Sequence, residues 1–266
     1  MRRTLILVLV GALLLGACGQ PGDDSQSPRE VIAAAAGAMQ DAGSARMAGS
    51  QQVESGQFAI DTASEGLIDF ESGDAQVTMT MSGLPTGEEK IELRLIDFIS
   101  YMQLPQFLRS DRFQGKDWIK IDLQKAGQQM GFDFAAMMQA SRQAETALQM
   151  LKGATDVEEV GTEELRGVET THYRYTLDLD RVIQEVPEDL KKSIQAVIDL
   201  GTGDIPGEIW VDEDGLTRKM SYEMSQSMQG QEMTQQMTLE YYDFGVDVEV
   251  EPPPASDVVD VTKMRP

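Results

Sequence analysis

Alternation of apolar and polar residues over long stretches is the feature that most restricts how this chain can fold. The stretches with this pattern or with short apolar runs are 67–71, 77–81, 91–95, 98–104 and 118–123. Clusters of turn-forming residues separate them, at 71–74, 84–87 and 114–117. A period of two places the apolar residues on one face of each strand. The pattern therefore predicts an antiparallel meander with one dry and one solvated face.

Three other segments have helical spacing. Ser27, Pro28 and Glu30 form a capping box with a proline in the first turn, which predicts a helix that Gly43 ends. Further helices are expected at 132–152 and 187–200. Further strands are expected at 171–179, 208–212, 216–228 and 231–244, with a hairpin turn at 214–215. Because the strands are grouped and the helices few, the order predicts an α+β fold: one antiparallel sheet with helices on one side.

The amino terminus has the anatomy of a secretory signal. Arg2 and Arg3 precede an apolar core, and Leu15-Gly16-Ala17-Cys18 ends it. This ending resembles the lipobox of bacterial lipoproteins, with Gly16 where alanine, serine or threonine is usual. The resemblance implies that diacylglycerol is joined to the Cys18 thiol. The alternatives are an ordinary cleaved signal with a chance cysteine, or an uncleaved anchor, for which the run is shorter than the about 20 residues required.

A lipid anchor would determine both location and chemistry. Acyl chains such as palmitate hold a protein on a membrane at about 0.8 kcal/mol per buried CH₂, so the expected place is the extracytoplasmic face of the plasma membrane. Cys18 is the single cysteine, so neither a disulfide within the chain nor thiol catalysis is expected. The formal net charge of -23 argues against nucleic acid as a partner, since nucleic-acid binding needs a basic surface.

The chain divides into four expected parts. Residues 1–17 are the signal peptide, 18–27 the lipidated cysteine and a tether rich in glycine, proline and aspartate, and 28–250 one domain. Residues 251–266 form a proline-rich tail, expected to be extended against the body or loose.

Residues that could perform catalysis or bind metal do not form a known site. His172 falls on the polar side of its strand, so a surface position is expected, and no Gly-x-Ser-x-Gly motif accompanies it. Asp212-Glu213-Asp214-Gly215 lacks the spacing of a calcium loop and is better explained as a hairpin turn. The glutamates at 158–159 and 163–164 fall in an expected polar loop, where nothing raises a carboxyl pKa. We therefore expect no enzyme, no cofactor and no metal.

Methionine is abundant, with 16 residues, and several share one strand parity. Met220, Met224 and Met237 are examples. Methionine is flexible and polarisable, so it suits a surface that adapts to varied apolar partners. Such a face could enclose acyl chains, and the alternative is ordinary core packing with methionine as filler.

Three segments carry a family resemblance. They are Gly167-Val168-Glu169-Thr170-Thr171-His172-Tyr173, Trp210-Val211-Asp212-Glu213-Asp214-Gly215-Leu216 and Pro252-Pro253-Pro254-Ala255-Ser256-Asp257-Val258. Together with the lipobox they resemble the LppX/LprA/LprF/LprG-type lipoproteins of actinobacterial envelopes. The resemblance implies a LolA-like fold, in which a strongly curved antiparallel sheet, a half-barrel, wraps over about three helices. It also implies carriage of a lipid or lipoglycan by binding, with an envelope transporter as a partner, but it assigns no pocket residues.

Two functions follow as hypotheses. The first is a membrane-anchored carrier that binds acyl chains in an apolar cavity. Its candidate lining residues, assigned by strand parity alone, are Met79, Met81, Ile91, Leu93, Ile119, Ile121, Tyr173, Tyr175, Met220, Tyr222, Met224, Met237 and Leu239. The second is a lipid-anchored interaction or sensor protein with a filled core and no ligand. A hydrolase is a third reading, for which the chain offers no nucleophile–base pair.

Overall fold

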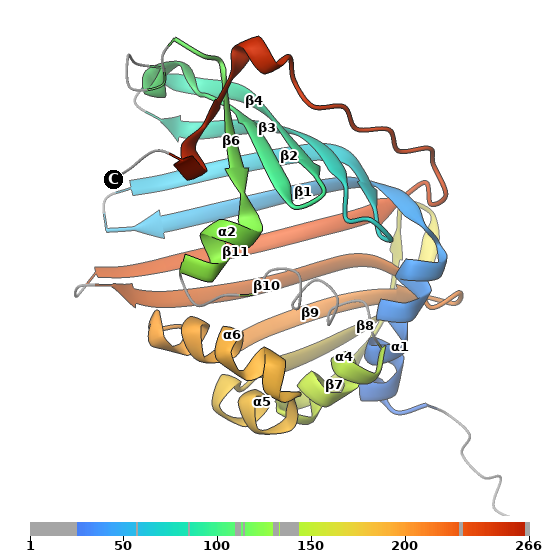
Figure 1. Cartoon of the computed structure of the whole chain (residues 1–266). Helices are drawn as coiled ribbons and strands as arrows, with labels where there is room; N and C mark the ends of the chain where they lie inside the picture. The colour runs from blue at the N-terminus through green and yellow to red at the C-terminus, as the bar shows by residue number, and fades with distance from the viewer. Residues whose placement is uncertain are drawn as a thin grey trace, which may run out of the picture.

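A computed structural model shows a mixed α+β fold built on one large sheet (Figure 1). It describes residues 26–56, 58–84, 86–109, 113, 115–129, 133, 144–228 and 231–263. The signal peptide and Cys18 lie outside these residues, so their assignments stay predictions, as does the division of the chain into domains.

Twelve strands form the sheet. They are β1 (Ser44–Ser55), β2 (Phe58–Asp69), β3 (Ala75–Leu84), β4 (Gly87–Ile96), β5 (Ile99–Gln103), β6 (Trp118–Asp122), β7 (Ala154–Leu165), β8 (Val168–Leu177), β9 (Ile205–Asp212), β10 (Thr217–Met228), β11 (Gln231–Tyr242) and β12 (Val258–Asp260). Their order is β12-β6-β5-β4-β3-β2-β1-β11-β10-β9-β8-β7. All neighbours pair antiparallel except β12 and β6, which pair parallel. The predicted α+β class and its antiparallel sheet are confirmed, with this one parallel pair as an addition.

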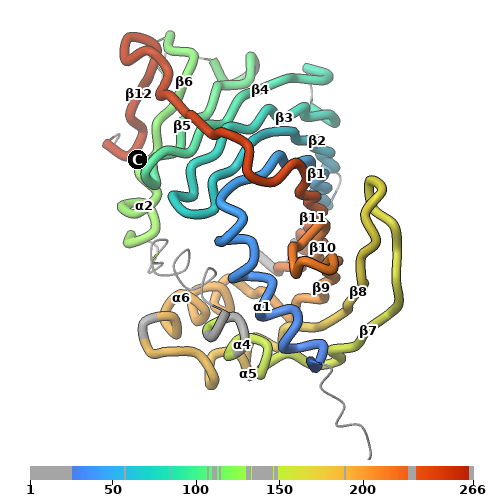
Figure 2. The backbone as a smooth tube through the Cα atoms, turned by 90° about the vertical axis from the view of Figure 1, so that its right-hand side faces the viewer, coloured from blue at the N-terminus to red at the C-terminus, as the bar shows by residue number. Residues whose placement is uncertain are grey.

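The described helices lie on one side of the curved sheet (Figures 1 and 2). They are α1 (Pro28–Asp41), α2 (Leu123–Gln129), α4 (Ala144–Lys152), α5 (Leu179–Glu185) and α6 (Glu188–Asp199). Helix α1 packs Ile32 and Ala35 against Tyr173 and Ile209 of the sheet. We call the sheet face that carries Tyr173 and Ile209 the inner face, and the opposite one the outer face.

Helix α1 begins where the capping residues predict. The Ser27 side chain accepts a hydrogen bond from the Glu30 backbone N–H, and the Glu30 carboxylate accepts one from the Ser27 N–H at 2.8 Å. The Ser27 hydroxyl also donates to the Glu30 carboxylate, at 2.7 Å. This bond and the one from the Ser27 N–H lower the pKa of Glu30 because they favour its charged form. Gly43 follows the helix with φ at 75°, a conformation that glycine adopts without a steric cost, so the predicted stop is confirmed.

Several elements differ from expectation. Strands β1 and much of β2 were not predicted, and neither were α2 and α5, the latter starting where a strand was expected to end at Leu179. The expected helix 132–152 lies partly outside the described residues, and its described part is α4. The glutamates at 158–159 and 163–164 do not lie in a loop. They belong to β7, whose pairing with β8 forms the edge of the sheet.

The carboxyl-terminal segment ties the two halves of the sheet together. β11 lies inside the sheet, and after it the chain runs past the strand ends to the edge beside β6, where β12 pairs with β6 (Figure 2). The Arg94 guanidinium donates to the Glu251 carbonyl at 2.7 Å, and the Thr262 hydroxyl accepts from the Asp122 N–H at 2.9 Å. Val259 is buried with Leu104 and Ile119. Residues 251–263 of the tail therefore form an ordered strap with a strand of its own.

Candidate functional site

The inner face carries continuous rows of registered residues that are largely apolar. One row crosses eight strands through Tyr173, Ile209, Met220, Leu239, Gly49, Ser64, Met79 and Ile91. A second crosses seven strands through Tyr175, Gly207, Tyr222, Met237, Gln51, Thr62 and Met81. A third joins Leu93, Met102 and Ile119. Paired residues project from the same face, so each row is a ridge of neighbouring side chains.

All the candidate lining residues lie on this inner face. Most stand in the rows above, and the other two follow from strand alternation: Met224 lies two residues beyond Tyr222, and Ile121 two residues beyond Ile119. The structure therefore brings together the residues that parity selected. Whether they line a lipid pocket stays a prediction.

Packing covers the two ends of the inner face more fully than its middle. At one end, α1 and α4 contribute Ile32, Ala35 and Leu151 to a buried cluster with Tyr173 and Ile209. At the other end, the strap and β6 form the cluster of Leu104, Ile119 and Val259. In between, the methionines and tyrosines of β10, β11 and β3 are only half-buried: Met79, Met81, Tyr222, Met224, Met237 and Tyr241. The central inner face thus presents apolar side chains that keep accessible surface.

Three tyrosines stand among these methionines, on β8, β10 and β11. The ring of Tyr175 lies across Gly207, where an added Cβ would come within 2.6–2.8 Å of three of its atoms. The Tyr222 hydroxyl is 2.9 Å from the Met237 sulfur. Tyr241 meets Phe70 edge-on, with ring centroids 5.7 Å apart. Each of the three tyrosine side chains is half-buried.

Burial is the main cause of the raised pKa of each of these tyrosines. It raises the pKa of Tyr241 to about 12, and it raises the pKa of Tyr175 and of Tyr222 as well. The neighbouring Tyr222 adds a smaller effect on both Tyr175 and Tyr241. Burial raises the pKa of a tyrosine because it disfavours the charged phenolate. The three phenols are therefore shielded from much of the solvent by surrounding protein atoms.

The burial of Tyr241 is expected to make the stability of the protein depend on pH in the alkaline range. An unfolded tyrosine ionises near pH 10, so between about pH 10 and 12 the unfolded state loses the Tyr241 proton before the folded state does. The free energy of unfolding must then fall with pH, by on the order of 2 kcal/mol for this group. Urea unfolding at about pH 9 and about pH 11.5 measures the loss, which Tyr241→Phe should reduce. Tyr242→Phe, on the outer face, is the matched control, and an equal effect of both variants would contradict this placement.

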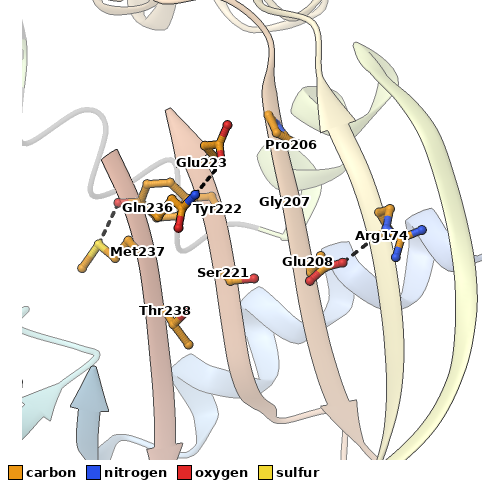
Figure 3. Close-up of a pocket in the computed structure, with 10 residues that line it drawn as sticks. All are labelled: Arg174, Pro206, Gly207, Glu208, Ser221, Tyr222, Glu223, Gln236, Met237 and Thr238. Atoms are coloured by element: carbon orange, nitrogen blue, oxygen red, sulfur yellow. Dashed lines mark hydrogen bonds and ion pairs between the residues drawn. The ribbon is translucent and has the colours of Figure 1, made fainter. Parts of the chain in front are cut away.

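The outer face is polar. An open groove of about 330 Å³ crosses it over β8–β11 (Figure 3). Its charged groups are already paired, because Arg174 contacts Glu208 at 3.2 Å and the Gln236 amide donates to Glu223 at 2.9 Å. Gly207, Tyr222 and Met237 of the inner-face rows also line this groove. Its paired polar groups do not suit an acyl chain, which gains no free energy from polar walls.

His172 also lies on the outer face but is buried, at 6% exposure, contrary to the expected surface position. Its ring stacks on Trp210, with centroids 4.1 Å apart, and its two nitrogens lie 3.5–3.6 Å from Glu163 and Glu208. The reason is the β7–β8 hairpin, which folds over this face so that Arg166 in its turn reaches Glu240 of β11 at 2.9 Å. Strand parity alone could not reveal this covering layer.

Among the described residues, histidine, cysteine, aspartate and glutamate side chains form no group of three or more that could hold a metal ion. Within the same ranges, each helix is too short or too polar to cross a bilayer.

Comparison with known proteins gives relatives among lipoproteins. No protein-family model matches the chain. An uncharacterised 31.2 kDa protein of Streptomyces griseus is 31% identical over 157 residues, which are 56% of this chain and 50% of that protein, so the match spans about half of that relative. A predicted lipoprotein of Streptomyces coelicolor is 30% identical over 235 residues, which cover 84% of this chain and 71% of that protein.

Solved structures with a similar backbone include two mycobacterial lipoproteins. LppX of Mycobacterium tuberculosis matches 85% of this chain and 100% of its own, with a TM-score of 0.48 and 13% identity. LprF of Mycobacterium bovis matches 85% and 96%, with a TM-score of 0.40 and 12% identity. Both are named members of the group that the sequence segments resemble. The Streptomyces coelicolor match confirms the recognition of a lipoprotein relative. On the strength of its Streptomyces coelicolor relative, the chain belongs to a family of actinobacterial lipoproteins.

Proposed function

We propose that the chain is a membrane-anchored lipid carrier of the cell envelope. Cys18 would hold it on the extracytoplasmic face of the plasma membrane, and the inner face would hold the acyl chains of a lipid or lipoglycan. A LolA-like half-barrel is the architecture that we associate with this role. The polar headgroup would stay in water, and an envelope transporter or acceptor would exchange the cargo.

One observation carries this proposal. The central inner face combines apolar, half-buried side chains with tyrosines that are strongly desolvated. Apolar surface that stays accessible on the side of a sheet covered by helices is costly unless a ligand covers it, since burial of such surface is worth about 25 cal/mol per Å². Methionines suit this purpose because they adapt to chains of different shape. A filled core, as the sensor hypothesis requires, would leave these side chains without accessible surface.

A matched pair of variants on β10 tests the proposal. Met224 lies on the inner face, whereas its neighbour Ser225 is exposed on the outer face. Met224→Asp is expected to lower lipid occupancy at least about tenfold, because an acyl chain beside a carboxylate desolvates it without a partner. Ser225→Asp adds the same charge on the other face and should leave occupancy unchanged.

Native mass spectrometry of the mature lipoprotein, released from detergent micelles, measures the occupancy and identifies the bound lipid. Circular dichroism and thermal unfolding confirm that both variants are folded. Wild-type protein that carries no lipid beyond its own anchor would contradict carriage and favour the docking alternative. Equal occupancy in folded Met224→Asp and wild type would instead show that the cargo lies elsewhere.

A further inference from the structure

The three inner-face tyrosines form a group of phenols that the apolar face does not require. We name Tyr175, Tyr222 and Tyr241 the phenol cluster. Tyr175 and Tyr222 are both register partners of Gly207, one on each side. Because glycine has no side chain, the Tyr175 ring extends across β9 toward Tyr222, as its contact with the glycine position shows. Tyr222 in turn contacts Met237 on β11, and Tyr241 lies four residues further along the same face of that strand.

The hydroxyls of the phenol cluster lack strong acceptors. Tyr222 donates to a thioether sulfur, which is a weak acceptor. In the portion of the chain that the structure describes, no hydrogen bond joins the Tyr175 or Tyr241 hydroxyl to another residue. All three side chains keep accessible surface, so a bound molecule could reach them. Phenylalanine would pack equally well against methionine, so the hydroxyls add hydrogen-bond donors to an otherwise apolar surface.

The surroundings decide which acceptor fits. The two registered rows that contain Tyr173 and Tyr175 include no lysine or arginine. A carboxylate or phosphate buried there would lack a counter-charge, which is costly. Neutral carbonyl oxygens accept hydrogen bonds from phenols without that cost. In a lipid, such oxygens occur where the acyl chains join the glycerol.

We propose that the phenol cluster binds the ester carbonyls of a diacylated glycerolipid and so determines how deep its acyl chains enter. This rests on the proposed function as a lipid carrier. The cluster would select esterified lipids over lipids whose chains are joined by ethers. It would leave a charged headgroup outside the apolar inner face, in water.

The test compares two lipids that differ only in these carbonyls: dioleoylglycerol and its dioleyl diether analogue. Each is titrated into micelles of the mature lipoprotein, and native mass spectrometry gives both affinities. We expect wild type to prefer the ester about fivefold or more, the size of one or two neutral hydrogen bonds. The double variant Tyr175→Phe/Tyr222→Phe should bind both lipids within about twofold of each other. Tyr242→Phe, on the outer face of β11, should keep the wild-type preference.

The outcomes separate the two proposals. If wild type binds both lipids equally well, the carrier function stands and the role of the phenol cluster is overturned. The same conclusion follows if the double variant keeps the full preference for the ester. If wild type binds neither lipid and carries no other, both the carrier function and this inference fail. Equal melting temperatures of the variants exclude a loss of folding as the cause.

Discussion

Replacing Val259 by aspartate is expected to lower the free energy of unfolding by about 3 kcal/mol or more. Val259 is 7% exposed and packs with Leu104 and with Ile119, which is its register partner on β6. A carboxylate at this position would be buried without a partner, which costs several kcal/mol. The strap would then detach, and β6 would lose its outer neighbour β12 and become the edge of the sheet.

Urea unfolding of the purified protein measures this effect. Ser256→Asp is the control, because Ser256 is exposed in the same segment and the substitution adds the same charge. Surface substitutions of this kind change stability by about 0.5 kcal/mol or less. Equal losses in the two variants would mean that the strap contributes nothing specific. A larger loss in Val259→Asp would establish that the strap closes the sheet.

Asp212→Ala is expected to have a similarly large effect, about 3–5 kcal/mol. The Asp212 side chain is 1% exposed and accepts hydrogen bonds from the backbone N–H groups of Asp214 and Leu216, at 3.0 and 2.9 Å. Its second oxygen lies 2.5 Å from the Arg218 guanidinium. Alanine would remove the acceptor of the hairpin turn and leave a largely buried cation unpaired.

Two further substitutions separate the contribution of the turn hydrogen bonds from that of the ion pair with Arg218. Asp212→Asn keeps an acceptor for the turn but removes the charge that pairs with Arg218, so we expect an intermediate loss. Asp214→Ala changes an exposed residue of the same turn and should cost about 0.5 kcal/mol or less. Thermal and urea unfolding measure all three. If Asp212→Ala unfolds like Asp214→Ala, the buried pair is not a source of stability.

The candidate site was predictable because strand alternation is a local property. Met79 and Met81, or Tyr222 and Met224, must project from one face of their strand whatever pairs with it. What alternation could not show is that these strands occupy one sheet in an order that joins their inner faces. Pairing between β11 and β1 links the first and last thirds of the chain, and only tertiary structure determines such long-range contacts.

The elements that were missed share a physical cause. Strand β1 carries Gly49, Ser50 and Gln51, residues with little strand preference, yet it lies in the middle of the sheet because β2 and β11 pair with it on both sides. Strand β7 is rich in exposed glutamate and is a strand because β8 supplies its partner. In both cases backbone hydrogen bonds from neighbours outweighed the local preference.

Residue order alone was sufficient for the first helix, for the strands with a clear period of two and for the side of each strand that is apolar, because those features depend on neighbours within a few positions. The folded arrangement alone decided the burial of His172 under a hairpin, the docking of the tail beside β6 and the approach of Tyr175 toward Tyr222 across Gly207. These contacts join residues that are distant along the chain. They stabilise the protein only after the strands have assembled into the sheet.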